Sequence, residues 1–185
     1  MLEMYERALK RTGETVAGTT REQFADPTPC SEWSVETLLD HIIGGCLTFA
    51  AGAEGRRVDA MNQPHLTGED HVSAYENAAR AALAGFRAPG ALERDFTLPW
   101  GDSPGSAALG LALADAAVHG WDLAKATGQE ATIDDDIAET LYAMTTQMME
   151  PKGRWPRMTA FNEPVDIGVD ATSAQKLVAY LGRTP

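Results

Sequence analysis

Three residues of types that can bind a metal stand close together in one segment rich in alanine and leucine, residues 112–128. Asp115 and His119 are four positions apart, and on an α-helix this spacing places two residues about 40° and one turn apart, on one face. Asp122 lies on nearly the same face, one turn further along. A carboxylate and an imidazole so placed can bind one divalent cation together. Taken alone, such a pair is more often a helix hydrogen bond or a satisfied core histidine.

His41 stands in a second strongly apolar segment. Its presence favours a metal site over a simple hydrogen bond between Asp115 and His119. The chain has four histidines, and His41 and His119 fall on the two segments that most resemble buried helices. Three ligands from two facing helices would leave an open position for water or substrate. Gly44 and Gly45 follow in the same segment, although each glycine costs a helix about 1 kcal/mol relative to alanine. Close packing against another helix and clearance for a metal or ligand both explain this pair, and the sequence does not separate them.

The remaining histidines and both cysteines are weaker candidates. His65 follows a proline in a polar stretch, and His71 stands among acidic residues. We expect both rings to face solvent. Cys30 and Cys46 form no CxxC pair and have no spacing typical of metal ligands. We therefore expect them to be buried free thiols, as is common in cytoplasmic proteins.

Apolar residues at helical spacing predict five or six helices around these groups, and hence an all-α bundle. The helices are expected from the amino terminus to 18–20, from 34 to about 52, 67 to 88, 106 to about 127, 134 to 150, and 172 to 181. Ser34 is placed as an N-cap, and Thr67 with Asp70 as a capping box. Residues 91–105 predict a short extended connection or hairpin arm, and residues 152–170 an irregular tail.

Composition limits the partners. The chain has 185 residues, enough for one domain over 1–185, with 44% hydrophobic and 23% charged residues. Its net charge of −12 would repel phosphate backbones and anionic lipids, so neither nucleic acid nor a membrane is expected as a partner. The same charge also simply aids solubility. The amino terminus has no apolar core of the signal-peptide kind, and we expect a cytoplasmic location.

Three stretches together resemble a known family. They are TPCSEWSVETLLDHIIGG, DAAVHGWDLAKATG and DATSAQKLVAYLGRTP, which span almost the whole chain. The sequence resembles the DinB-like metal-binding bundles of actinobacteria, and most of all the amino-terminal metal-binding domain of mycothiol-dependent maleylpyruvate isomerase and its short single-domain relatives. The resemblance implies a DinB-like four-helix bundle with additional short helices and an irregular carboxyl-terminal tail.

The resemblance also implies roles for individual residues. The first histidine ligand falls on His41, the acidic ligand on Asp115 and the second histidine on His119, around zinc as the first candidate metal and nickel as the second. The isomerase pattern usually has glutamate at the acidic position, and the shorter Asp115 could loosen coordination. Asp122 is implied as the partner that orients His119. Trp121 is implied as a packing residue that can also line the pocket.

These roles favour a metal- and thiol-dependent transferase or isomerase, in which a low-molecular-weight thiol such as mycothiol attacks a small electrophilic substrate. The isomerase has a further carboxyl-terminal domain. This sequence stops at Pro185 after one short helix, so we expect that domain to be absent and do not carry maleylpyruvate isomerisation over. Metal-assisted hydrolysis ranks lower, because no general base stands out. A non-catalytic small-molecule-binding or stress-response bundle is the alternative from another class. A homodimer through one helical face is also compatible with the sequence.

Overall fold

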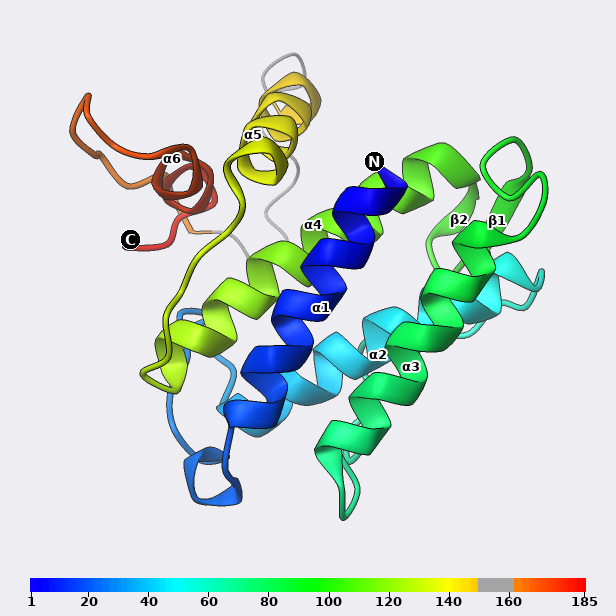
Figure 1. Ribbon diagram of the computed structural model, residues 1–185, viewed down its shortest axis with the longest axis horizontal. Coiled ribbons are helices and arrows are strands. Elements are labelled where there is room, and N and C mark those ends of the chain that lie inside the picture. The colour runs from blue at the N-terminus through cyan, green and yellow to red at the C-terminus, as the bar shows by residue number, and fades with distance from the viewer. Residues whose placement is uncertain (150–161) are drawn as a thin grey trace.

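The computed structural model describes residues 1–149 and 162–185 (Figure 1). Over these residues the fold is mostly α-helical, as predicted. The helices are α1 (Leu2–Gly18), α2 (Val35–Ala53), α3 (His71–Arg87), α4 (Gly105–Ala126), α5 (Asp135–Met149) and α6 (Ser173–Tyr180), with a 3-10 turn η1 (Arg21–Gln23). Strands β1 (Asp95–Leu98) and β2 (Gly101–Pro104) form an antiparallel hairpin.

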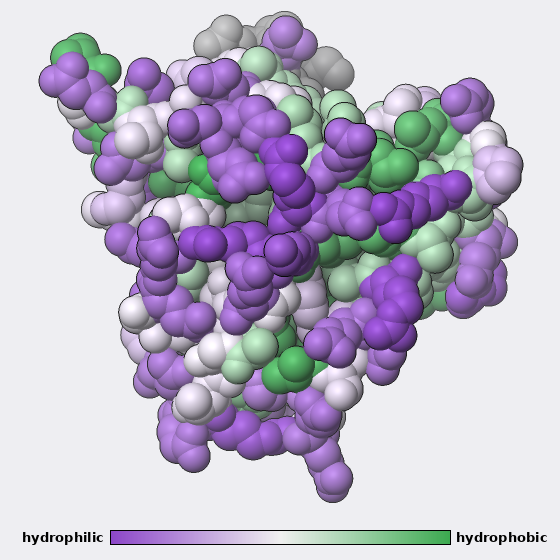
Figure 2. Space-filling view, viewed as in Figure 1, coloured by the Kyte–Doolittle hydropathy of each residue, from purple (hydrophilic) through white to green (hydrophobic). Residues whose placement is uncertain are grey.

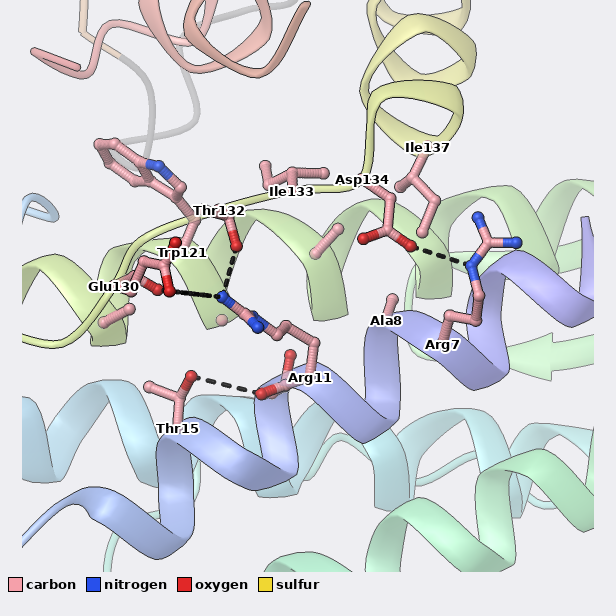
Figure 3. Close-up of a pocket in the computed structure, with 14 residues that line it drawn as sticks. Arg7, Ala8, Arg11, Thr15, Trp121, Glu130, Thr132, Ile133, Asp134 and Ile137 are labelled. Atoms are coloured by element: carbon pink, nitrogen blue, oxygen red, sulfur yellow. Dashed lines mark hydrogen bonds and ion pairs between the residues drawn. The ribbon is translucent and has the colours of Figure 1, made fainter.

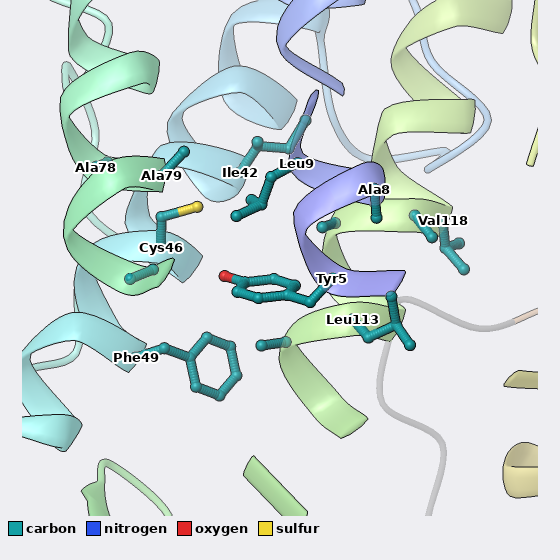
Figure 4. Packing of buried hydrophobic residues seen from close by; sticks show 14 of the residues in the cluster. Tyr5, Ala8, Leu9, Ile42, Cys46, Phe49, Ala78, Ala79, Leu113 and Val118 are labelled. Carbon is teal, nitrogen blue, oxygen red and sulfur yellow. The ribbon is translucent and has the colours of Figure 1, made fainter. Parts of the chain in front are cut away.

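The main core lies among α1, α2, α3 and α4. Helices α1 and α2 each pack against both α3 and α4, so the four enclose a common interior (Figure 1). Large side chains fill it, and Figure 4 shows the ring of Tyr5 reaching from α1 toward Cys46 and Phe49 of α2. The rings of Tyr5 and Phe86 meet edge to face at 5.4 Å. Burial of each such side chain contributes about 1.5–3 kcal/mol, so this core holds α2 and α4 in contact.

The start of α2 follows the prediction and the start of α3 does not. The Ser34 side chain accepts a hydrogen bond from the Thr37 N–H and caps α2. Asp70, which was expected at the third position of a capping box, is itself the N-cap of α3. Thr67 was wrongly placed as that cap. Its N–H donates to the buried carboxylate of Asp40 instead, which draws it into the preceding loop.

The segments outside this core are smaller. The predicted hairpin is present, and its residues Phe96 and Leu98 are buried. Helices α5 and α6 pack on each other, and α5 also contacts α4 (Figure 1). Residues 162–170 contain no helix or strand, as expected, while the expected irregular stretch 152–161 and the expected helix stop at Pro151 lie outside the described residues.

One face of the molecule is largely polar. On the face seen in Figure 2, hydrophilic side chains predominate and leave smaller apolar areas between them. In the part of the chain that the structure describes, no helix combines the length and apolar character needed to cross a membrane.

Candidate metal centre

His41, Asp115 and His119 come together where α2 packs on α4. The His41 Nε2 lies 3.2 Å from the Asp115 Oδ1, and the His119 Nε2 lies 3.8 Å from the same oxygen. The two imidazole rings meet edge to face with their centroids 4.8 Å apart. One ligand atom from each residue therefore fits within a sphere of a few ångströms. Local spacing set the relation of Asp115 to His119, and the crossing of the helices adds His41.

The other nitrogen of each ring is held by an acceptor. The His41 Nδ1 lies 3.2 Å from the carbonyl oxygen of Met61, and the His119 Nδ1 lies 3.1 Å from the Asp122 Oδ2. A carbonyl or a carboxylate can only accept, so in both rings Nδ1 carries a hydrogen. Each Nε2 is thereby directed toward Asp115, and the Nε2 of His41 also lies within hydrogen-bond distance of that carboxylate, where a bound cation would take the place of its hydrogen. Metal-binding histidines are typically held in this way, with the distal nitrogen bound to a carbonyl or a carboxylate.

The electrostatics of the cluster favour a bound cation. Burial opposes the charged form of Asp115, but the hydrogen bond from His41 and the charges of both histidines outweigh it and lower the pKa of Asp115. Burial likewise opposes protonation of His41, yet the hydrogen bond and charge of Asp115 raise the pKa of His41. The side chains of His41, Asp115 and His119 keep 14%, 17% and 11% of their surface exposed, so the cluster is reachable from solvent.

The two adjacent glycines have separate reasons. A Cβ on Gly45 would lie 2.5 Å from the Asp115 Oδ2, so glycine leaves the space that this carboxylate occupies. A Cβ on Gly44 would clash with the backbone carbonyl of Ala60, in the loop after α2. Gly45 thus gives clearance for a candidate ligand. Gly44 allows close packing of a loop, whereas the two explanations left open by the sequence were packing of another helix and clearance for a ligand.

The donor set fits a small divalent cation. Two imidazole nitrogens and one carboxylate oxygen match the three protein ligands of open zinc sites. Tetrahedral zinc with bonds of about 2.0–2.1 Å holds its ligand atoms about 3.3 Å apart. The observed separations of 3.2 and 3.8 Å are close to this spacing. The aspartate at this position therefore reaches both histidines despite its shorter side chain.

Behind His119 lies a second polar cluster that the sequence did not predict. Asp122 has no exposed side-chain surface, and the guanidinium of Arg183 approaches its two oxygens at 3.1 and 2.8 Å. Burial raises the pKa of Asp122, but hydrogen bonds from His119 and Arg183 more than offset this and bring it to about 2. We call Cys30, Asp122 and Arg183 the inner cluster. It fixes the carboxylate that holds the His119 ring.

Cys30 completes the inner cluster as a buried free thiol, as predicted. Its Sγ lies 3.4 Å from the Asp122 Oδ2 and 3.5 Å from the Arg183 Nη2. Burial, followed by the charge of Asp122, raises the pKa of Cys30 to about 12. Cys30, His119 and Asp122 also bring ligand atoms close together. There the guanidinium already supplies the positive charge, so this group is a poorer cation site than the one at Asp115.

The two tryptophans nearest in sequence to these groups lie in different places. The ring of Trp33 lies 4.6 Å from that of His41 and 5.7 Å from that of His119. Trp121 is buried and lines another pocket, between α1, α4 and residues 130–137 (Figure 3). That pocket of about 20 Å³ has room for about one water molecule. None of the three converging residues lines it.

Among the remaining histidines and cysteines, His65 and Cys46 lie as expected and His71 does not. His65 is exposed, as expected. The expectation that His71 faces solvent was wrong, since it is half-buried, with its Nε2 3.0 Å from the Thr19 carbonyl oxygen and its ring against Phe24. Cys46 is buried, as predicted. Its thiol pKa is raised to about 12, mainly by burial.

Comparison with known proteins agrees with the fold. The chain belongs to the family described as the mycothiol maleylpyruvate isomerase N-terminal domain, whose model matches residues 5–124. His41, Asp115 and His119 all lie within this range, and Arg183 lies beyond it. The resemblance predicted from three short stretches is therefore confirmed.

Relatives of two kinds are similar to this chain. Two proteins of Mycobacterium tuberculosis, from strains CDC 1551 / Oshkosh and H37Rv and both described as uncharacterized, are each 33% identical over 180 residues, which is 97% of this chain and 96% of theirs. Crystal structures of the mycothiol-dependent maleylpyruvate isomerase and of a histidine-to-alanine mutant give TM-scores of 0.63 and 0.60. Both cover 83% of this chain and 71% of theirs at 16% identity, which shows a shared fold.

Proposed function

We propose that this chain binds one divalent cation through His41, Asp115 and His119, with zinc as the first candidate and nickel as the second. The observation that carries the proposal is the orientation of the two rings. Each Nδ1 is bound to an acceptor and each Nε2 faces one carboxylate oxygen, at 3.2 and 3.8 Å. If the two histidines only satisfied hydrogen bonds in the core, their rings would have no reason to point to the same oxygen of Asp115.

We further propose that residues 1–185 act as one domain that transfers or isomerises a small electrophile with a low-molecular-weight thiol of the mycothiol type. The family to which the chain belongs supports the choice of thiol. A bound divalent cation would lower the pKa of a coordinated thiol and so supply a thiolate near neutral pH. The buried, uncharged thiol of Cys30 is no competing nucleophile. The cytoplasm, where small thiols are kept reduced, is the proposed location, and both cysteines are free, in agreement with this.

The protein's own residues would hold and orient the reactants. His41 and His119 contribute neutral nitrogen ligands, and Asp115 contributes negative charge. The exposed part of these side chains leaves an approach for the thiol and the substrate. Trp33 lies beside both rings and would form an apolar wall of this approach.

Metal content of the purified protein, measured by mass spectrometry, tests the first proposal. We expect near-stoichiometric metal in the unaltered protein and its loss in His119→Ala. His71→Ala is the matched control, because it removes a half-buried histidine that bonds to Thr19 and not to Asp115. A folded protein that takes up neither zinc nor nickel would contradict the metal proposal and leave the non-catalytic binding bundle as the better reading.

A thiol-conjugation assay tests the second proposal. The protein, with mycothiol and a panel of small electrophiles, is assayed before and after removal of metal by a chelator. We expect conjugation or isomerisation that requires both thiol and metal. Turnover that survives loss of the metal would contradict the thiol-activation mechanism, while stoichiometric metal without any turnover would favour a binding protein.

A further inference from the structure

Asp40 stands directly before His41 on α2, and the functional site described above does not include it. Its side chain is buried. One oxygen accepts the N–H of His65 at 2.8 Å and the other accepts the N–H of Thr67 at 2.9 Å. A buried carboxylate is costly unless its oxygens are hydrogen-bonded, and here the backbone of a loop supplies both bonds. Asp40 therefore anchors the loop between α2 and α3.

Two more positions on α2 hold the same loop. The Thr48 Oγ1 accepts the N–H of Ala60 at 3.0 Å, and Gly44 lets the Ala60 carbonyl approach the helix. Asp40, Gly44 and Thr48 are spaced by four residues, so they form one stripe along α2. The adjacent stripe carries His41 and Gly45, which face Asp115. One face of α2 thus anchors the loop, and the neighbouring face forms the metal centre.

The loop returns to the metal centre through Met61. This residue follows Ala60, and its carbonyl oxygen accepts from the Nδ1 of His41. The loop is also held in a conformation that a free chain would avoid, because His65 has a φ of +66°, in the left-handed region. Such a conformation persists only where its surroundings determine it, and the His65 N–H is one of the two that Asp40 binds.

We propose that Asp40 is a positioning residue of the metal centre. It fixes residues 60–67 so that the Met61 carbonyl holds the Nδ1 hydrogen of His41 and keeps Nε2 directed toward Asp115, where the cation would bind. The inference rests on the proposed metal site for its functional meaning. Its structural part, the state of the His41 ring, exists without metal.

Asp40→Asn is the decisive variant. An amide oxygen replaces one acceptor and an NH₂ group faces the other N–H, so one loop anchor is lost. We expect zinc affinity, measured by competition with a chelator, to fall about tenfold, the lower end of the range for residues that orient ligands. In the metal-free protein, NMR of the His41 ring is expected to show an Nδ1 hydrogen that exchanges slowly with solvent in the unaltered protein and faster in the variant.

Two further variants separate positioning from general stability. Asp70→Asn changes an exposed aspartate that caps α3 through Ser73, and it is expected to leave zinc affinity and the exchange of the His41 Nδ1 hydrogen unchanged. Thr48→Val removes the other anchor with little change of shape, and it is expected to act like Asp40→Asn but more weakly. It also serves if Asp40→Asn does not fold. Unchanged zinc affinity and unchanged exchange of this hydrogen in both loop variants would overturn the inference. If the unaltered protein binds no zinc, the proposed function fails, and the exchange measurement alone decides this inference.

Discussion

Helix α4 carries two carboxylates in contrasting surroundings, two turns apart. Asp115 keeps 17% of its side-chain surface exposed and lies between the Nε2 atoms of two histidines. Asp122 is sealed from solvent and is bound by the guanidinium of Arg183. His119 contacts both carboxylates, with Nε2 on the outer side and Nδ1 on the inner.

The difference lies in the source of positive charge. At Asp122 a permanently charged guanidinium completes the pair, so this carboxylate is a structural element. At Asp115 the neighbours are imidazoles, which can yield their Nε2 lone pairs to a metal. The same side chain on the same helix is thus a ligand candidate in one place and a support for a ligand in the other. The predictions below test this division, from the largest expected effect to the smallest.

Arg183→Met should have the largest effect on stability. It leaves the carboxylate of Asp122 buried without its partner, and breaking a buried ion pair in this way costs about 3–5 kcal/mol. The free energy of unfolding from urea titration measures the loss. Arg7→Met is the control, because Arg7 makes exposed ion pairs with Asp134 and Asp136, and its loss should change stability little. Equal losses in the two variants would show that the inner cluster is not a structural element.

Asp115→Asn should mainly affect the metal. It removes the negative ligand but leaves a side chain of the same shape, so we expect zinc affinity to fall by about a hundredfold or more, beyond the range for residues that only orient ligands. The free energy of unfolding should fall far less than in Arg183→Met. If metal affinity is retained, Asp115 is not a ligand and the contrast between the two carboxylates is lost.

Substitutions at Gly44 and Gly45 separate effects on the loop from effects on the metal site. In Gly45→Ala the added methyl would meet the Asp115 carboxylate, and we expect roughly a tenfold loss of zinc affinity, similar to that from a displaced supporting residue. In Gly44→Ala the methyl strikes the Ala60 backbone, and we expect a loss of about 1–3 kcal/mol in stability, the usual cost of overpacking. Chelator competition and urea titration on both variants check this. Loss of stability in Gly45→Ala together with loss of zinc affinity in Gly44→Ala would refute this expectation.

Cys30→Ala should have the smallest effect. The thiol is buried, and its pKa of about 12 keeps it protonated at neutral pH, so it contributes neither a nucleophile nor a ligand. We expect zinc affinity and turnover to stay within about twofold, well below the effect of removing a residue that orients a ligand. Alkylation of the unaltered protein should label neither cysteine until denaturant is added. Loss of metal in this variant would instead place the cation in the inner cluster.

Local sequence determined much of this molecule. The spacing of Asp115 and His119, the apolar stripe of α2 and the cap at Ser34 each involve neighbours within a turn or two. Such relations follow from helix geometry alone. The mostly helical fold was predictable for the same reason. The meeting of His41 with the α4 pair was expected from two apolar segments that each carry a histidine, and the family resemblance supported it, but no local spacing determines it.

Only the tertiary structure decided what surrounds these residues. Arg183 lies 61 positions from Asp122, and no local spacing links them. The acceptor at Met61 is a backbone carbonyl. Every residue type has one, so the sequence does not indicate which carbonyl binds His41. Thr67 matched a capping pattern, but Asp40 competes for its N–H from another helix. Sequence thus determined which groups could bind a cation. Packing of distant segments decided which nitrogen each ring presents and which carboxylate is left open, because both depend on partners that only the folded chain brings together.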